Sequence, residues 1–296
     1  MTITEHSPTT TAPPVRMLWL DLTRKCQLEC VHCYNESGPT GDHGTMTRAH
    51  WFTVVDQAAT TEVEHIQLIG GEPTLHPDAL AIARRALATG LHVEVYSNLV
   101  HVSDAWWELW AHPRASLATS YYSADPDRHN AMTGRPASHR HTRANIARAV
   151  ERGVRLRVSI ITPNGEGVEA TRAELETLGV THIGVDHVRL FGRGNPTEGT
   201  DVSGLCGACG DGRAAISPDG TVSPCVMSAW MGVGNTREAP LAGIPAGAPM
   251  AQARNVITAA KKDEPAPQPP PPNPIPCSPD QYCSPGTPRS ECPPRN

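Results

Sequence analysis

Short apolar runs alternate with amphipathic segments along the first two thirds of the chain. Six of these runs have the length and apolar content of buried strands, at 15–22, 64–69, 91–96, 115–122, 154–162 and 183–191. The segments between them predict helices at about 45–60, 77–89, 103–110, 138–152 and 168–178. Strands that alternate with helices in this way build a parallel sheet with right-handed crossovers. The pattern therefore predicts an α/β fold.

Three cysteines follow the first predicted strand in a C-x3-C-x2-C spacing: Cys26, Cys30 and Cys33. Thiolates bind zinc or iron–sulfur clusters, and a cubane cluster of four irons ordinarily takes four of them. Three local cysteines would leave one iron open, where a small molecule can bind the cluster and accept an electron. A structural zinc knuckle completed by His32, His43 or a distant ligand is the alternative.

The triplet, followed by the aromatic Tyr34, resembles the signature of the radical S-adenosylmethionine (radical SAM) enzymes. The resemblance implies that SAM binds the open iron of a [4Fe-4S] cluster through its amino and carboxylate groups. It also implies that the reduced cluster cleaves SAM to methionine and a 5′-deoxyadenosyl radical, which takes hydrogen from a substrate. The fold implied is a partial (β/α)6 TIM-like barrel. His32 stands where the family often has an aromatic ring near the adenine.

A second motif, Gly70-Gly71-Glu72-Pro73, ends the second predicted strand. Paired glycines let the backbone turn sharply and approach a ligand closely, and Glu72 adds a carboxylate. Taken alone, the motif is more simply explained as an ordinary strand-to-helix turn. In the radical SAM family a GGE at this place hydrogen-bonds the amino group of SAM. The resemblance therefore assigns this motif to SAM binding.

Polar residues near the ends of the later strands are weaker candidates, because cofactor groups in such folds bind at the carboxyl ends of strands. The family places polar groups for the ribose and carboxylate of SAM there. The matching positions are Ser97, Asn98, Ser120, Ser123, Arg157 and Ser159. Each can instead be a turn or strand residue whose polar group is satisfied locally. The tryptophans Trp106, Trp107 and Trp110 are expected to pack a helix.

The composition changes after Arg193, and six of the nine cysteines follow it. Cys206 and Cys209 form a C-x2-C, and a C-x10-G-x4-C run continues through Gly220 to Cys225. This spacing resembles the opening of the SPASM or twitch extension of radical SAM enzymes. In that extension a β-hairpin delivers ligands to an auxiliary iron–sulfur cluster. A zinc ribbon is the alternative.

The end of the chain departs from the family pattern. A Pro-rich linker at 265–276 leads to Cys277, Cys283 and Cys292, and the denser C-x2-C-x5-C-x3-C block of a full SPASM domain is missing. Six cysteines cannot fill two closed clusters of four ligands each. We therefore predict one auxiliary cluster, held by Cys206, Cys209, Cys225 and one of the three cysteines after the linker. In the alternative, the linker tethers a flexible or metal-binding tail.

Composition sets the cellular context. The net charge of −5, without a basic run, argues against nucleic-acid binding. No signal peptide and no membrane span are evident, so we expect a cytoplasmic protein. A reducing cytosol disfavours disulfides, which leaves metal or cluster ligation to explain the cysteines. The expected parts are a leader at 1–14, a radical SAM core at 15–195, a SPASM/twitch-like region at 196–264 and a tail at 265–296.

The expected function is that of a radical SAM oxidoreductase or maturase. Radical SAM enzymes with such C-terminal cysteines often modify ribosomally made peptides, forming crosslinks, thioethers or epimerised residues, so a peptide is the first expected substrate. An electron donor such as flavodoxin or ferredoxin would reduce the cluster. One alternative is dehydrogenation or rearrangement of a small molecule in antibiotic or sugar-derived metabolism. The other is a non-catalytic iron–sulfur or zinc scaffold or sensor.

Overall fold

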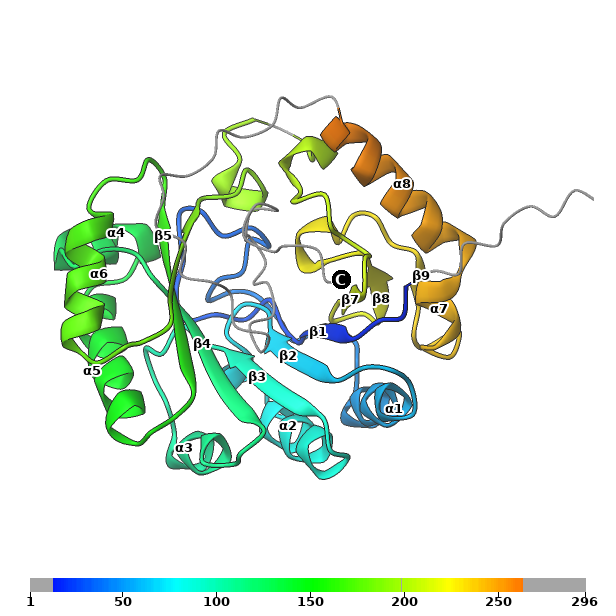
Figure 1. The fold of residues 1–296 in the computed structure, drawn as a ribbon, viewed down its shortest axis with the longest axis horizontal. Helices are drawn as coiled ribbons and strands as arrows, with labels where there is room; N and C mark the ends of the chain where they lie inside the picture. The colour runs from blue at the N-terminus through cyan, green and yellow to red at the C-terminus, as the bar shows by residue number, and fades with distance from the viewer. Residues whose placement is uncertain (1–12, 198, 263–296) are drawn as a thin grey trace, which may run out of the picture.

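Nine strands form one continuous sheet that curves into part of a barrel (Figure 1). The computed structural model describes residues 13–197 and 199–262. The order of the strands is β6-β5-β4-β3-β2-β1-β7-β8-β9. The first six are β1 (Met17–Asp21), β2 (His65–Ile69), β3 (His92–Tyr96), β4 (Ala115–Tyr121), β5 (Leu156–Thr162) and β6 (Ile183–His187). Neighbours among these six are parallel, which confirms the predicted α/β sheet.

Helices cover the outer face of these strands (Figure 1). They are α1 (Arg48–Ala59), α2 (Ala79–Ala88), α3 (Asp104–Trp110), α4 (Pro126–Thr133), α5 (Ser138–Glu151) and α6 (Val168–Thr177). Thr47 caps α1 by accepting a hydrogen bond from the N–H of His50, whose ring accepts one from the N–H of Thr47. Trp106, Trp107 and Trp110 are buried in the core, as predicted.

Helix α4 has no counterpart among the predicted helices. Its sequence is mostly polar and only two of its residues are buried, so it lacks the apolar spacing that identifies a helix. Asp125 caps it by accepting a hydrogen bond from the N–H of Asp127, with Pro126 in the first turn. Gly134 ends it in the left-handed region at φ 65°. The end residues, rather than an apolar face, identify this helix.

Strand β6 ends at His187, before the predicted end at residue 191. The N–H of Val188 still donates to the carbonyl of Thr162 on β5, but the chain then leaves the sheet and forms a 3-10 turn at Gly192–Gly194. Phe191, which the apolar run placed in the strand, packs in a separate cluster on the inner face. The prediction was wrong here because an apolar residue can be buried without being part of the sheet.

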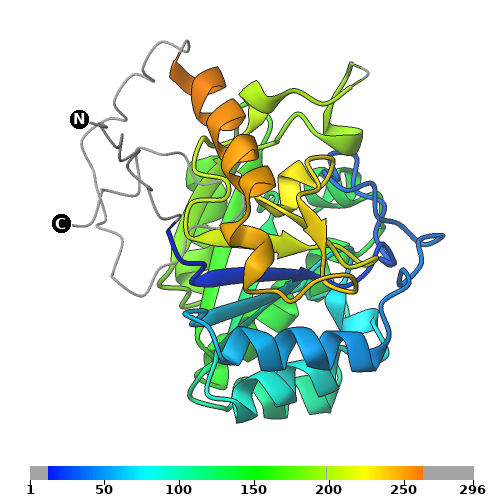
Figure 2. The ribbon, with the colours of Figure 1, turned by 90° about the vertical axis from the view of Figure 1, so that its right-hand side faces the viewer.

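The C-terminal cysteine region continues the same sheet. Strand β7 (Arg213–Ile216) lies parallel to β1, and β8 (Thr221–Ser223) and β9 (Gly234–Asn235) follow in antiparallel order. The β7–β8 hairpin turns at Gly220, where φ is 89°. Two helices, α7 (Gly243–Ala246) and α8 (Ala248–Lys262), complete the described chain. Figure 2 shows α8 on the opposite side of β1 from α1.

The two faces of the sheet carry separate apolar clusters. Leu18 and Leu20 of β1 belong to the cluster under the outer helices, whereas Met17 and Trp19 belong to the other, as the period of two along a strand requires. We call the second set the inner cluster. Its buried members are Met17, Trp19, Ile69, Phe191, Leu205, Cys209, Ala215, Cys225, Val226 and Ile257. Among the helices of residues 13–197 and 199–262, none combines the length and apolar content needed to cross a membrane.

Candidate cluster and cofactor site

The loop that carries the cysteine triplet lies against the GGEP turn at the ends of β1 and β2. The N–H of Gly71 donates to the carbonyl of Thr23 at 2.7 Å. The N–H of Glu72 donates to the carbonyl of Lys25 at 2.9 Å. A Cβ atom at Gly70 would lie 2.6 Å from the Thr23 oxygen, and one at Gly71 would lie 2.5 Å from the Lys25 oxygen. Both glycines are therefore needed for the two motifs to meet.

The three thiols of the triplet are free and influence one another electrostatically. Burial, with a smaller contribution from neighbouring charges, raises the pKa of Cys26 and of Cys30 to about 12. Thiolates at this place are therefore costly without a compensating positive charge. A metal cluster supplies that charge, because its binding is coupled to loss of the thiol protons. The residues present fit a cluster.

Hydrogen-bond donors surround the sulfurs of the triplet. The N–H of Leu28 donates to Sγ of Cys26 at 3.4 Å, and Nδ2 of Asn98 approaches the same sulfur at 3.6 Å. A hydrogen bond from the Tyr122 hydroxyl lowers the pKa of Cys30 against the larger effect of burial. Such donors stabilise charge on a cluster-bound sulfur and influence the reduction potential of the cluster.

Three buried polar atoms around Cys33 have no hydrogen-bond partner within the described chain: Nδ1 of His32, the hydroxyl of Tyr34 and Nδ2 of Asn35. Buried polar groups are rarely left unpaired. Burial, together with the charge of Arg193, lowers the pKa of His32 to about 4, so the ring is neutral at pH 7. One ring nitrogen then accepts and the other donates. These atoms can supply hydrogen-bond partners to a polar cofactor, and the contact of His32 and Tyr34 with SAM stays a prediction.

Glu72 is fully buried, and its carboxylate is bonded within the protein. Oε1 accepts hydrogen bonds from the N–H and the hydroxyl of Thr74 at 3.0 and 2.7 Å, and Oε2 accepts one from the N–H of Asn98 at 2.8 Å. Burial raises the pKa of this carboxyl, and the hydrogen bonds oppose that shift. Pro73 follows as the first residue of a short 3-10 helix. The contact of Glu72 with the SAM ammonium stays a prediction.

Ser97 and Asn98 lie at the end of β3, beside Glu72. Ser97 is buried, and its hydroxyl accepts a backbone hydrogen bond from two residues on. The side chain of Asn98 accepts from Nε2 of Gln27 at 3.0 Å, which links β3 to the cysteine loop. Ser123 accepts a backbone hydrogen bond just before α4, as a turn residue does. The structure therefore brings Ser97 and Asn98 to the candidate site and gives Ser123 a local role.

Ser120, Arg157 and Ser159 project from the inner face of β4 and β5. Ser120 lies opposite Ser159 in the register of the two strands and shares a 2.9 Å hydrogen bond with the hydroxyl of Tyr96. Arg157 donates to both carboxylate oxygens of Glu94, from Nε at 2.7 Å and from Nη2 at 2.6 Å. The charge of Arg157 is thus paired within the barrel. Its part in SAM binding, like that of the two serines, stays a prediction.

A second cysteine site lies at the inner cluster. Sγ of Cys209 lies 3.9 Å from Sγ of Cys206 and 3.2 Å from Sγ of Cys225. The hydrogen bond with Cys209 lowers the pKa of Cys206 to about 5 and also lowers the pKa of Cys225, while the pKa of Cys209 itself is raised. Negative charge is therefore favoured on two of these sulfurs, as metal or cluster ligation requires.

Outside the described residues lie the three tail cysteines, Cys277, Cys283 and Cys292. The described chain ends with α8, which packs beside the second cysteine site. A Cβ atom at Gly207 would lie 3.0 Å from the side chain of Lys261, and Ile257 is buried in the inner cluster. The last described residues therefore lie next to Cys206. That a tail cysteine supplies the fourth ligand stays a prediction.

The zinc alternatives require several ligands around one ion. Within residues 13–197 and 199–262, no three or more His, Cys, Asp or Glu side chains converge on a single metal ion, whereas a cubane cluster takes one protein ligand at each iron. His43, the alternative ligand for the triplet, shares a 2.8 Å hydrogen bond with the hydroxyl of Thr23. Its ring also lies edge-on to that of His76, with 5.0 Å between the ring centroids. The His43 ring is therefore already held by contacts with Thr23 and His76 rather than directed at the triplet as a ligand would be.

Tyr34 lies between the two cysteine sites. It follows Cys33 directly in the chain, and its ring packs against the inner cluster, which contains Cys209 and Cys225. After burial, the charges of Cys33 and Cys225 both contribute to the raised pKa of its hydroxyl. Tyr34 is therefore part of the surroundings of both cysteine sites.

Sequence reasoning missed two residues that contact the cysteine loop, Asn35 and Arg193. Oδ1 of Asn35 accepts a hydrogen bond from the hydroxyl of Ser37 at 2.8 Å and lies 3.1 Å from Sγ of Cys33. Arg193 donates to carbonyls of the loop. A usable signal existed for Arg193, because glycines flank it directly after a predicted strand, and paired glycines indicate a close backbone approach.

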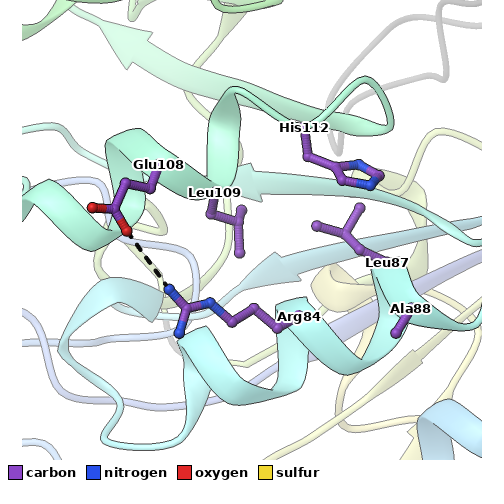
Figure 3. A pocket seen from close by; sticks show the side chains of 6 residues that line it. All are labelled: Arg84, Leu87, Ala88, Glu108, Leu109 and His112. Carbon is purple, nitrogen blue, oxygen red and sulfur yellow. Dashed lines mark ion pairs between the residues drawn. The ribbon is translucent and has the colours of Figure 1, made fainter.

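A surface pocket among the outer helices contains none of the predicted site residues. It lies between α2 and α3 (Figure 3). Its lining residues are Arg84, Leu87, Ala88, Glu108, Leu109 and His112. Arg84 and Glu108 form an ion pair there at 4.0 Å. This pocket is therefore separate from both cysteine sites.

The fold is a partial α/β barrel with a cysteine triplet after its first strand. A second cysteine site lies beside the added hairpin. Together these features define an iron–sulfur protein. The chain belongs to the radical SAM superfamily, whose family model matches residues 20–192. A second model, the SPASM iron–sulfur cluster-binding domain, matches residues 206–269. The resemblance seen in the motifs is thus confirmed, and with it the cofactors of the family: a [4Fe-4S] cluster, SAM and auxiliary iron–sulfur clusters.

Curated relatives match about three fifths of this chain at 27–30% identity. The PqqA peptide cyclase of Xanthomonas campestris is 30% identical over 191 residues, 62% of this chain and 50% of that protein. Mycofactocin maturase MftC of Mycobacterium tuberculosis is 27% identical over 184 residues, 61% and 46% of the two chains. Pre-heme d1 synthase of Dinoroseobacter shibae is 27% identical over 197 residues, 64% and 47%. The chain thus spans about half the length of these relatives.

Solved structures share the fold. Streptococcus suis SuiB bound to its precursor peptide SuiA aligns with a TM-score of 0.70 at 14% identity, over 84% of this chain and 68% of SuiB. The protein anSMEcpe with bound AdoMet and the Cp18Cys peptide aligns with a TM-score of 0.64 at 12% identity, over 83% and 84% of the two chains. At these identities the likeness shows the fold alone. It confirms the predicted partial TIM-like barrel with its cysteine-rich extension.

Proposed function

We propose that this protein is a radical SAM enzyme that abstracts a hydrogen atom from a ribosomally made peptide. The observation that carries the proposal is a pair of cysteine sites that Tyr34 joins, since its hydroxyl is influenced by both Cys33 and Cys225, with unpaired polar atoms beside the first site. Among the relatives are a PqqA peptide cyclase and a mycofactocin maturase, and the structural neighbour SuiB is bound to a precursor peptide. These comparisons support a peptide substrate.

The residues of the cysteine loop divide the work at the first site. The three thiolates hold the cluster, and His32, Tyr34 and Asn35 offer their unpaired polar atoms to SAM. When bound, the reduced [4Fe-4S] cluster supplies the electron that cleaves SAM to methionine and a 5′-deoxyadenosyl radical. The buried side chains of Trp19 and Phe191 form part of an apolar wall that keeps solvent and external reductants from an organic radical.

The second site accepts an electron in this proposal. Formation of a crosslink removes two hydrogens from the peptide: one leaves as an atom to form 5′-deoxyadenosine, and the other leaves as a proton together with one electron. Cys206, Cys209, Cys225 and one tail cysteine would hold an auxiliary cluster there, which would supply the acceptor for that electron. Cys277 is 15 residues beyond Lys262, which allows a span of up to about 50 Å, so a tail ligand can reach the site.

An external electron donor completes the proposal, because the first cluster must be reduced before each SAM cleavage. A flavodoxin or ferredoxin has the low potential that this step needs. The same requirement places the protein in a reducing compartment, the cytoplasm. The six cysteines within the described residues are all free thiols, in keeping with that assignment.

A second candidate function is the modification of a small molecule. Pre-heme d1 synthase at 27% identity and the AdoMet-dependent heme synthase of Methanosarcina barkeri at 28% match this chain about as well as the peptide maturases do. In this alternative the inner face receives a tetrapyrrole, and the second site again accepts an electron from the substrate.

Anaerobic reconstitution with iron and sulfide, followed by SAM and dithionite, tests the proposal. The probes are synthetic versions of short peptides encoded by genes next to that of this protein. We expect one of them to raise the yield of 5′-deoxyadenosine and to become lighter by two hydrogens in mass spectra. A tetrapyrrole that raises the yield when the peptides do not would favour the second candidate. No 5′-deoxyadenosine under any condition would contradict both.

A further inference from the structure

The segment that follows β6 crosses directly over the cysteine loop. The N–H of Arg193 donates to the carbonyl of Cys33 at 3.0 Å. Its side chain donates twice more, from Nε to the carbonyl of Cys30 at 2.8 Å and from Nη2 to the carbonyl of Ser37 at 2.6 Å. One residue therefore binds the loop before, at and after its last cysteine, although it lies 163 residues from Cys30 in the sequence.

Glycines on both sides of Arg193 permit this contact. Gly192 has φ 51°, and a Cβ atom there would lie 2.5 Å from the carbonyl oxygen of Cys33. A Cβ atom at Gly194 would lie 2.4 Å from the carbonyl oxygen of Arg189 and 3.2 Å from that of His32. No residue with a side chain fits at Gly192 without moving the cysteine loop. The backbone at 192–194 is therefore shaped to bring the arginine onto the loop.

The charge of Arg193 acts on the triplet without a neutralising carboxylate. Within the described chain no Asp or Glu forms an ion pair with it, whereas Arg24, also beside the loop, pairs with Asp21 at 2.5 Å. The guanidinium lies directly against the triplet, because its Nε is hydrogen-bonded to the carbonyl of Cys30 at 2.8 Å. The guanidinium is therefore an uncompensated positive charge next to the site proposed for the cluster.

We propose that Arg193 is a positioning residue that holds the cysteine loop closed around the cluster and makes the cluster easier to reduce. The inference rests on the proposed function, because it assumes that the triplet binds the cluster. Two properties of the guanidinium are involved. Its planar fork binds two carbonyls at once, which an ammonium group on a single stem does not reproduce. Its charge favours the state of the cluster that has gained one electron from the reductant.

The two properties predict different results for two substitutions. Arg193→Lys keeps the charge but loses the fork, so the cluster should be lost faster while its potential stays close to that of the parent. Arg193→Gln loses both. At an effective dielectric of about 20, removing one charge within about 10 Å of a redox centre should lower the ratio of reduced to oxidised cluster at a fixed potential at least roughly tenfold.

The experiment uses the full chain, reconstituted with iron and sulfide. Redox titration followed by electron paramagnetic resonance measures the reduced cluster, and only the signal that changes on addition of SAM is counted, which excludes the auxiliary cluster. Release of iron to a chelator measures the closure of the loop. Arg84→Gln on α2 is the control, because it removes the same charge from a side chain that is 57% exposed on the outer layer.

We expect Arg193→Gln to lower the ratio of reduced to oxidised cluster at a fixed potential at least roughly tenfold and to release iron several-fold faster. Arg193→Lys should change only the release, and Arg84→Gln should change neither. A parent-like potential in Arg193→Gln, or parent-like iron release in Arg193→Lys, would overturn the inference about Arg193 and leave the proposed function standing. If Arg193→Gln does not fold, the Lys variant still decides whether the fork matters. A parent chain without any SAM-responsive signal would overturn the proposed function as well.

Discussion

The two cysteine sites of this protein use the same residue type for different surroundings. At the first site, one loop supplies all three cysteines, and unpaired polar atoms of His32 and Asn35 lie beside them. At the second site, the sulfurs are in mutual contact within an apolar cluster, and a further ligand is expected from outside the described residues. The first site is thus suited to an open iron that binds a polar cofactor. The second is suited to a cluster that only exchanges electrons.

Exchanging each set of cysteines for alanine gives the largest effect. The triple substitution at Cys26, Cys30 and Cys33 should abolish 5′-deoxyadenosine formation, because no open iron remains to bind SAM. The matched triple substitution at the second site should leave SAM cleavage in place and remove only the modified substrate. Chromatography of 5′-deoxyadenosine measures both. SAM cleavage by the first triple variant would show that the sites have been assigned the wrong way round.

Iron content separates the ligands of the second site. The protein without the triplet should hold about four irons per chain after reconstitution if one auxiliary cluster is present, and about eight would mean two. Truncation after Lys262 should then remove most of that iron, because the tail supplies the fourth thiolate. Unchanged iron in the truncated chain would exclude the tail cysteines as required ligands. Zinc in place of iron would leave the second site without a redox role.

Glu72→Gln examines the polar character of the first site. Loss of a charge-assisted hydrogen bond to the SAM ammonium should cost about 1.5–3 kcal/mol, a tenfold to hundredfold loss of SAM affinity, measured by equilibrium binding to the reconstituted protein. The cluster should remain. Because the carboxylate also accepts hydrogen bonds from Thr74 and Asn98, Thr74→Ala is the control. An equal loss in Thr74→Ala would assign the effect to the turn rather than to the ammonium.

The smallest expected effect is a pH dependence of the barrel. Burial lowers the pKa of His129 from 6.5 to about 3, so below pH 6.5 the unfolded chain takes up a proton that the folded chain does not. Stability is therefore lost as pH falls from 6.5 toward 3. At pH 5.5 this residue should cost about 1.4 kcal/mol relative to pH 7.5.

Denaturant unfolding at both pH values measures this cost. His129→Gln should reduce the difference in unfolding free energy between pH 7.5 and 5.5 by about that amount. The exposed His141→Gln should change it little. A pH difference in His129→Gln equal to that of the parent would show that His129 titrates normally. Residues 188–296 contain no histidine, so this effect belongs to the barrel part alone.

Local signals in the sequence located most of the fold. Buried parallel strands are short continuous apolar runs, and five of the six predicted strands begin and end within about two residues of the observed bounds. The sixth failed because Phe191 is buried by the inner cluster rather than by the sheet. Helix α4 was missed because its polar sequence has no apolar face. The pairing of β7 with β1 has no local signal, since it joins segments far apart in the chain.

The site was predictable in its chemistry and less so in its contacts. The spacing of the cysteines identified the family, which the match over residues 20–192 confirms. The carbonyl contacts of Arg193 and the bonding of Glu72 to Thr74 depend on loops that meet only in the folded chain. The same holds for Tyr34, whose place between the two sites follows from the hairpin that joins β1. The roles of the tail cysteines lie outside the described residues.

The central claim is that the first site, and not the second, binds SAM. The most direct measurement is the electron paramagnetic resonance spectrum of the reduced protein, with and without SAM, in the variant in which Cys206, Cys209 and Cys225 are alanine. We predict a cluster signal that changes when SAM is added, because the triplet alone leaves an iron open. A signal that SAM leaves unaltered in this variant, with a SAM-dependent change in the variant that lacks the triplet, would contradict the account.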